Sequence, residues 1–246
     1  MLKLVDKGVI IKEFLPQGEI QQVLVCLHGF AGDSESSVIL ELANNLNKKN
    51  VLVVTFDFPC HGNDDAFRIL NLNECFNYLK IVDDYIKNEY KDVDFSYFAT
   101  SFGAFVLLNF LQHTNYFYNK IILRAPAIFM DRILKDNILP GHNFDLEDLK
   151  AHPLNLGLDK QLMVDWKFYQ DLINNSLENF RTNKFLYIIQ GKKDNVVDFK
   201  ENEAFFEKCC SPNYKIIYFE NADHRFKNEG ELEEIVQIVE GLLVNK

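Results

Sequence analysis

Short apolar stretches alternate with amphipathic stretches along most of the chain. The apolar stretches are rich in Val, Ile, Phe and Tyr, and several are continuously apolar, which is typical of parallel strands covered on both faces. The predicted strands are residues 9–14, 21–27, 51–57, 93–99, 119–124, 184–190 and 214–219. The predicted helices are residues 36–48, 71–89, 102–112, 198–209 and 231–244. This alternation predicts an α/β fold with right-handed crossovers in one mostly parallel sheet.

The N-terminal part departs from this alternation. The first two predicted strands, residues 9–14 and 21–27, have no helix between them. We therefore expect them to form an antiparallel hairpin at the edge of the sheet. Residues 6–8, with the sequence Asp-Lys-Gly, are a candidate turn beside it.

A second departure is the segment of residues 127–183, which contains no clear strand. A long excursion inside a compact domain is usually functional, for example as an active-site lid. We therefore expect a lid, inserted after the sixth strand into a core domain made of residues 1–126 and 184–246. The alternative is a helical decoration that only packs on the sheet. The segment's candidate substrate-binding residues are Phe129, Met130, Trp166 and Tyr169.

One serine lies in an unusual setting, in the sequence YFATSFGAF of residues 97–105. Ser101 follows a predicted strand and precedes a predicted helix, and small residues lie two positions away on each side, Ala99 and Gly103. A tight strand–turn–helix connection strains the residue at its centre and projects that side chain from the sheet edge. Free N–H groups at the helix start stabilise negative charge there. Ser101 is therefore a candidate nucleophile.

The order of residues along the chain selects partners for Ser101. In doubly wound hydrolases the nucleophile is followed by an acid and then by a histidine. Asp194 and Asp198 follow the predicted strand after the insertion, and His224 is the histidine beyond them. We prefer Asp194 because it lies in the loop at the strand's end, whereas Asp198 has the position of a helix N-cap. The sequence thus predicts a triad of Ser101, His224 and Asp194.

The turn after residues 21–27 offers an oxyanion site. This turn has the sequence HGFAGDSESS, and we expect the backbone N–H of Phe30 to point at the serine. The N–H of Phe102, directly after Ser101, is the second candidate donor. Two such donors contribute several kcal/mol to acyl transfer. We expect His28 to shape this loop rather than to titrate.

The net charge and the cysteine content limit the kinds of molecule that we expect the protein to bind. The chain has 246 residues and a formal net charge of −10, and its pI is about 5.1. Nucleic acids and anionic membranes favour basic surfaces, so we expect neither as a partner. The five cysteines form no CxxC pair, and the N-terminus lacks the apolar core of a signal peptide, so we expect reduced thiols, no metal site and a cytoplasmic protein. A homodimer is compatible with the sequence.

Five motifs together resemble the α/β-hydrolase family. They are LHGFAG (27–32), FDFPCHGNDD (56–65), ATSFGA (99–104), GKKDNVVD (191–198) and ADHRF (222–226). The resemblance is nearest to the carboxylesterase branch that includes the cinnamoyl and feruloyl esterases. It implies a lid over an acyl or aryl pocket, and a serine hydrolase that cleaves small-molecule carboxylic esters through an acyl-enzyme without a cofactor.

Three alternatives stay open beside the esterase. A small-peptide or amide hydrolase would use a carboxylate for the substrate's N-terminus, for which Glu147 or Asp148 is a candidate. A thioesterase acting on coenzyme A esters would use basic residues at the pocket mouth, for which Lys192 and Lys193 are candidates. A non-catalytic binding protein of the same fold would usually lack a triad residue, and here all three are present.

Overall fold

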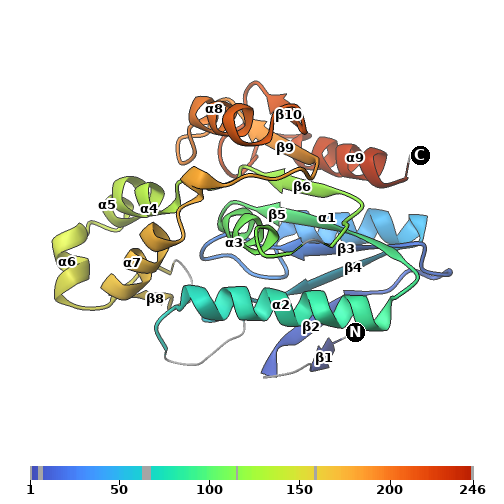
Figure 1. Cartoon of the computed structure of the whole chain (residues 1–246), viewed down its shortest axis with the longest axis horizontal. Helices are drawn as coiled ribbons and strands as arrows, with labels where there is room; N and C mark the ends of the chain where they lie inside the picture. The colour runs from blue at the N-terminus through green and yellow to red at the C-terminus, as the bar shows by residue number, and fades with distance from the viewer. Residues whose placement is uncertain (1, 5–7, 63–67, 115, 158–159, 245–246) are drawn as a thin grey trace.

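An eight-stranded sheet forms the centre of the molecule (Figure 1). The computed structural model describes residues 2–4, 8–62, 68–114, 116–157 and 160–244. The strand order across the sheet is β1-β2-β4-β3-β5-β6-β9-β10. The strands are β1 (Leu2–Leu4), β2 (Ile10–Phe14), β3 (Gln22–Leu27), β4 (Val51–Phe56), β5 (Asp94–Thr100), β6 (Ile121–Arg124), β9 (Leu186–Gly191) and β10 (Tyr214–Phe219). All pairs from β4 to β10 are parallel, and β2 is antiparallel to both β1 and β4.

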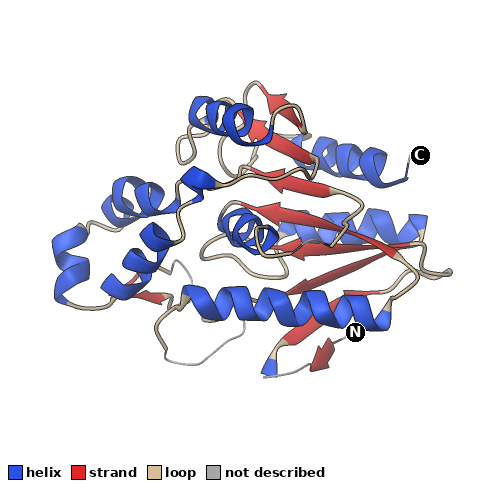
Figure 2. Ribbon diagram, viewed as in Figure 1, coloured by secondary structure: helices blue, strands red, loops and turns tan. Residues whose placement is uncertain are grey.

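Helices cover both faces of the sheet (Figure 2). The helices of the core are α1 (Ser37–Leu46), α2 (Leu72–Glu89), α3 (Phe102–Leu111), α8 (Phe199–Cys210) and α9 (Glu231–Val244). Strand β3 contributes to both layers, because Val23, Val25 and Leu27 pack with α2, α3 and α8 while Leu24 and Cys26 pack with α1 and α9. This period of two explains why the central strands are apolar at nearly every position.

The predicted strands and core helices agree with the structure to within a few residues, but the predicted pairing of residues 9–14 with residues 21–27 is wrong. Strand β2 lies between β1 and β4, so the N-terminal edge hairpin joins β1 to β2. Five of the six residues of β3 are buried, so this strand needs a neighbour on each side and occupies the sheet centre. Strand β2 alternates between buried and more exposed positions, which is typical of a strand near the edge. Of the predicted turn, Asp6 and Lys7 lie outside the described residues.

The segment of residues 127–183, called the cap below, lies at the carboxyl end of the parallel strands (Figure 1). Its helices are α4 (Met130–Ile133), the π-helix η3 (Leu134–Ile138), α5 (Leu139–Gly141), α6 (Leu146–Ala151), α7 (Trp166–Asn174) and the 3₁₀-helix η4 (Leu177–Asn179). The cap also holds an antiparallel ribbon of β7 (Leu154–Asn155) and β8 (Met163–Val164), which corrects the expectation of no strand there. Two-residue strands are too short to show an alternating pattern in the sequence.

Polar contacts attach the cap to the core at more than one place: the N–H of Leu70 donates to the carbonyl of Met163 at 2.8 Å, and two side-chain contacts lie near the loop after β9. The guanidinium of Arg132 pairs with the carboxylate of Glu201 on α8 at 2.9 Å. The side-chain amide of Asn137, in the π-helix, donates to the backbone carbonyl of Val196 at 2.7 Å. The cap therefore contacts the core next to the loop that follows β9. None of the helices in the described part of the chain has the length and apolar character needed to cross a membrane.

Gly191 at the end of β9 provides a test of the close packing between this strand and the loop that follows β10. A Cβ atom at this position would lie 2.4 Å from the backbone carbonyl oxygen of Ala222, which cannot rotate away. We expect Gly191→Ala to lower the free energy of unfolding in urea by about 2 kcal/mol, the usual cost of overpacking. Gly141→Ala is the control, because no atom lies within 4 Å of its added Cβ. An unchanged stability of Gly191→Ala would contradict this packing.

Candidate active site

Ser101 occupies a strained turn between β5 and α3. Its backbone has φ 51° and ψ −114°, a conformation that residues other than glycine rarely adopt. Hydrogen bonds on both sides hold it there: the Ser101 N–H donates to the carbonyl of Arg124 at 2.9 Å, and the Ser101 carbonyl accepts from the N–H of Ala127 at 3.2 Å. The serine hydroxyl makes no capping bond to α3, so it is available for another partner.

The small residues around Ser101 are required by a close backbone approach. A Cβ atom at Gly103 would lie 2.5 Å from the carbonyl oxygen of His28, in the loop after β3. Ala99 on the other side is fully buried. Helix α3 therefore starts almost in contact with the β3 loop, and this contact brings Ser101 next to Gly29 and Phe30.

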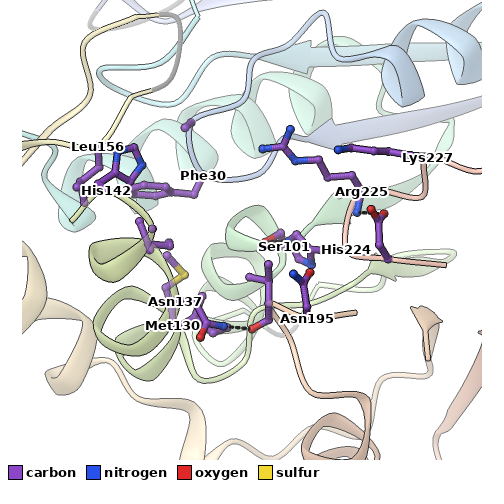
Figure 3. A pocket seen from close by; sticks show the side chains of 16 residues that line it. Phe30, Ser101, Met130, Asn137, His142, Leu156, Asn195, His224, Arg225 and Lys227 are labelled. Atoms are coloured by element: carbon purple, nitrogen blue, oxygen red, sulfur yellow. Dashed lines mark hydrogen bonds between the residues drawn. The ribbon is translucent and has the colours of Figure 1, made fainter. Parts of the chain in front are cut away.

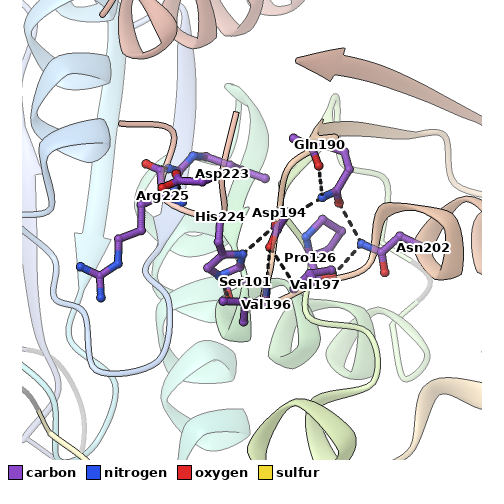
Figure 4. Close-up of polar contacts among 12 residues, drawn as sticks. Ser101, Pro126, Gln190, Asp194, Val196, Val197, Asn202, Asp223, His224 and Arg225 are labelled. Atoms are coloured by element: carbon purple, nitrogen blue, oxygen red, sulfur yellow. Dashed lines mark hydrogen bonds and ion pairs between the residues drawn. The ribbon is translucent and has the colours of Figure 1, made fainter. Parts of the chain in front are cut away.

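The three residues of the predicted triad lie within hydrogen-bonding distance of one another (Figure 4). His224, in the loop after β10, has its Nε2 atom 3.1 Å from the Ser101 Oγ atom. Its Nδ1 atom lies 2.8 Å from the Oδ2 atom of Asp194, in the loop after β9. A carboxylate opposite Nδ1 places the imidazole proton there, which leaves Nε2 free to accept a proton from the serine. Asp198 is not part of this group, because its carboxylate caps α8 by accepting from the N–H of Lys200 at 2.7 Å.

The carboxylate of Asp194 is fully buried and is held from several sides. Its Oδ1 atom accepts from the N–H groups of Val196 and Val197 at 2.9 and 2.8 Å. Its Oδ2 atom accepts from the side-chain amide of Gln190 at 3.3 Å, in addition to His224. These bonds fix the carboxylate in the orientation that the imidazole needs.

Two buried amides continue this network away from the triad. The Asn202 side-chain amide donates to the Gln190 Oε1 atom and to the Pro126 carbonyl, each at 3.0 Å. Both amide side chains are almost completely buried. Sequence reasoning did not identify them; the available signal is a glutamine at the end of a strongly apolar strand, where an amide needs a partner.

A buried arginine supports the loop that carries His224. The Arg124 guanidinium donates to the carbonyl of Arg225 at 2.7 Å and lies 4.7 Å above the ring centre of Phe226. Burial lowers the pKa of Arg124 to about 10, and the charges of Asp194 and Asp223 oppose that shift. The guanidinium therefore remains charged at neutral pH and fixes the residues directly after the histidine.

The two predicted oxyanion donors lie on either side of the serine. A Cβ atom at Gly29 would be 3.4 Å from the Ser101 Cβ atom, so the turn that contains Phe30 lies against Ser101. The rings of Phe30 and Phe102 pack edge to face with 5.9 Å between centres. Within the described residues, the backbone N–H groups of Phe30 and Phe102 have no hydrogen-bond acceptor, and this leaves both available to a ligand.

His28 fixes this turn through both ring nitrogens. Its Nδ1 atom donates to the carbonyl of Gly29 at 2.8 Å, and its Nε2 atom accepts from the N–H of Phe58 at 3.0 Å. Complete burial lowers the pKa of His28. Only the neutral ring can make both bonds, so these bonds and the lowered pKa both favour the neutral form, and His28 ties the loop after β3 to the loop after β4.

A pocket of about 420 Å³ opens beside Ser101 (Figure 3). Its lining residues are Phe30, Ala31, Ser101, Met130, Ile133, Asn137, Ile138, Gly141, His142, Leu156, Asn195, Val196, Asp223, His224, Arg225 and Lys227. Of the four predicted substrate-binding residues, only Met130 is among them. Phe129 lies under the Arg132 guanidinium, and Trp166 packs against Tyr169 inside the cap.

The pocket also contains polar residues that sequence reasoning did not select. His142 and Asn137 come from the cap, whereas Asn195, Arg225 and Lys227 come from the loops after β9 and β10. Asn195, Arg225 and Lys227 each follow a predicted triad residue by one to three positions, and this closeness is the one signal that could have identified them. The cap residues have no comparable signal, because their place depends on how short helices fold over the core.

These features define an α/β-hydrolase of the serine type, and comparison with known proteins gives the family. The chain belongs to the serine aminopeptidase S33 family, whose model matches residues 18–143, just over half of the chain. No curated protein matches it. The predicted resemblance to the α/β-hydrolases is confirmed by this match, and its likeness to Est1E, in the structures described next, holds for the fold.

Several solved structures share the fold over nearly the whole chain. Est1E from Butyrivibrio proteoclasticus, in a structure with ferulic acid bound, is 20% identical with a TM-score of 0.81 and covers 99% of this chain and 98% of its own. Alpha/beta hydrolase domain-containing protein 10 from mouse is 13% identical (TM-score 0.75, 99% and 98% covered). Monoglyceride lipase from Saccharomyces cerevisiae is 15% identical (TM-score 0.74, 97% and 92% covered).

Gln190 provides a test of the network behind the triad. Replacing it by leucine removes the amide donor to Asp194 and one of the two acceptors of the Asn202 amide, which keeps its bond to the Pro126 carbonyl. Loss of one buried hydrogen bond costs about 1–3 kcal/mol, so we expect Gln190→Leu to lower kcat for p-nitrophenyl acetate about tenfold or more, with little change in KM. The rate is normalised to the fraction of active sites, so that misfolded protein does not count.

The exposed Gln237 on α9 gives a matched control, since Gln237→Leu makes the same substitution far from the network. A split between kcat and KM separates positioning of the acid from a general loss of stability. If Gln190→Leu kept the kcat of the unmodified protein, the amides would have no part in orienting Asp194.

Proposed function

We propose that the protein is a serine hydrolase that cleaves carboxylic esters with Ser101 as the nucleophile. The observation that carries the proposal is the continuous line of contacts from Asp194 through His224 to Ser101, at 2.8 and 3.1 Å. Distances of this size allow proton transfer between the hydroxyl and the imidazole. The line ends at the edge of a pocket large enough for a small ester.

In the first half of the proposed reaction the acyl group of the substrate is transferred to Ser101. The Ser101 Oγ atom attacks the ester carbonyl while the His224 Nε2 atom takes the hydroxyl proton. Asp194 stabilises the imidazolium, and the N–H groups of Phe30 and Phe102 stabilise the oxyanion of the tetrahedral intermediate. His224 then gives its proton to the leaving alcohol, and an acyl-enzyme remains.

The second half releases the acid. A water molecule enters from the pocket, and the His224 Nε2 atom takes one of its protons as the oxygen attacks the acyl carbonyl. The same two N–H groups bind the second oxyanion. The intermediate collapses, Ser101 takes back its proton from His224, and the free acid leaves. The residues of this chain supply every step.

The pocket walls favour an apolar acyl or aryl group. Phe30 from the core and Met130, Ile133, Ile138 and Leu156 from the cap form its apolar side. In this proposal the cap is the lid of the pocket, because most of the apolar lining comes from it. Two solved structures with this fold hold ligands of related chemistry: ferulic acid in Est1E, and a substrate analog in the yeast monoglyceride lipase.

The particular residues predicted for the alternative substrates, Glu147, Asp148, Lys192 and Lys193, lie outside the pocket lining. Glu147 and Asp148 are on α6, where Glu147 pairs with Lys150 and Asp148 closes the capping box of that helix. Lys192 pairs with Glu220 at 2.7 Å. The α6 carboxylates are therefore not placed at the serine to bind a peptide's N-terminus. The lysines are likewise not placed there to bind a coenzyme A group. Ester hydrolysis is the function that this site supports best.

The nucleophile and the acid are tested together with p-nitrophenyl acetate. We expect Ser101→Ala to lower kcat by a factor of about 10⁵ or more, and Asp194→Asn by about 10⁴, the sizes measured in other serine triads. The control is Asp198→Asn, which makes the same substitution in the neighbouring carboxylate that only caps α8. It should leave turnover unchanged. Undiminished turnover by Ser101→Ala would end the proposal.

A further inference from the structure

Two basic side chains lie side by side at the pocket, next to the candidate catalytic histidine. Arg225 and Lys227 both follow His224 in the loop after β10, and both line the pocket. Figure 3 shows them running in the same direction, across the pocket from His142 and Leu156. The pocket thus has an apolar side formed largely by the cap and a basic side formed by the histidine loop.

The backbone of this loop is held firmly, while the two basic side chains remain outside. Phe226, between them, is buried with φ 55°, and its ring packs edge to face on Phe219 with 5.3 Å between centres. The Arg225 N–H donates to the Asp223 carboxylate at 2.8 Å, and the Arg225 carbonyl accepts from Arg124 at 2.7 Å. The buried Phe226 therefore fixes the backbone between Arg225 and Lys227, and the two basic side chains lie at the pocket.

These two cations have no anionic partner within the described residues. Neither Arg225 nor Lys227 makes an ion pair or a side-chain hydrogen bond there. The chain has 36 acidic and 26 basic residues, so carboxylates are plentiful. Many lysines elsewhere are paired, as in Lys12–Glu35, Lys49–Glu240, Lys80–Asp84, Lys87–Asp83, Lys167–Asp171 and Lys192–Glu220.

The carboxylate in the pocket lining does not neutralise them. Asp223 is the one acidic residue among the described lining residues, and its Oδ1 atom is occupied by the backbone N–H of Arg225. No ion pair joins it to either basic side chain in the described part of the chain. The pocket therefore carries an excess of positive charge in a protein whose overall formal charge is −10.

We infer that the site selects esters that carry an anionic group, a carboxylate or a phosphate, in addition to an apolar acyl or aryl part. This inference rests on the proposed ester hydrolysis and specifies its substrate class. The apolar part contacts the cap, and the anionic group lies against the histidine loop. Arg225 presents a planar fork that matches two oxygens of a carboxylate or phosphate, and Lys227 adds a second charge.

The test compares anionic esters with neutral esters of nearly the same shape. On the acyl side, the mono-p-nitrophenyl ester of adipic acid is compared with its methyl p-nitrophenyl diester. On the alcohol side, 3-acetoxybenzoate is compared with methyl 3-acetoxybenzoate, and 3-acetoxyphenyl phosphate supplies the phosphate. We expect a kcat/KM ratio of about tenfold in favour of the anionic member in at least one pair, the effect of one charge-assisted hydrogen bond. The pair that shows it identifies the anion and the side of the substrate that carries it.

The double variant Arg225→Gln/Lys227→Gln should lower that ratio about tenfold, since it removes both charges. The control is Lys208→Gln/Lys215→Gln, which removes the same charge from exposed positions outside the pocket and should keep the ratio. In the unmodified protein, added salt should lower the ratio because it screens exposed charges. The salt series gives a result even where the double variant does not fold.

Failure of this inference can be distinguished from failure of the proposed function. If the unmodified protein hydrolyses the neutral esters through Ser101 but shows no preference for any anionic member, the inference is wrong and the proposed function stands. A preference that survives in the double variant, or that does not fall with salt, would also overturn it. If the unmodified protein hydrolyses none of these esters, the proposed function fails, and this inference fails with it.

Discussion

The close approach of helix α3 to the loop after β3 is the constraint on which the site depends. Gly103 leaves room for the carbonyl of His28, and the turn before it then needs a residue with positive φ, which is Ser101. Such a conformation costs about 1–3 kcal/mol, so the surroundings must hold it. The carbonyl of Arg124 and the N–H of Ala127 do so. In this turn the hydroxyl makes no capping bond to α3, and the N–H of Phe102 has no acceptor in the described part of the chain.

The other parts of the site are loops at the ends of neighbouring parallel strands, each held by buried polar groups. Gln190 and Asn202 hold the acid loop after β9, and Arg124 holds the histidine loop after β10. His28 holds the turn after β3. Because buried polar groups are costly unless they are paired, each network favours a single loop conformation. In the proposed reaction, the groups that react are thus in place before a substrate binds.

The core and the three candidate catalytic residues were predictable from the sequence for physical reasons. A strand buried on both faces is almost continuously apolar, as β4 is apart from Thr55. Ser101 and Asp194 follow the largely buried strands β5 and β9, whereas His224 follows the more exposed edge strand β10 and was found from the order of residues along the chain. The pocket was not predictable in the same way. Trp166 and Tyr169 lie three residues apart on α7 with 5.2 Å between their ring centres, and composition does not reveal that this part of the helix lies outside the pocket lining. The position of β3 between β4 and β5 was also not predictable, because it depends on which strands pair across the sheet.

The most direct test of this account is reaction with a fluorophosphonate probe, followed by mass spectrometry of the labelled peptide. The account predicts one adduct per chain, on Ser101, because this hydroxyl lies 3.1 Å from the imidazole that would activate it. His224→Ala should slow the labelling by orders of magnitude. A protein that stays unlabelled, or that carries the adduct on a residue other than Ser101, would contradict the account.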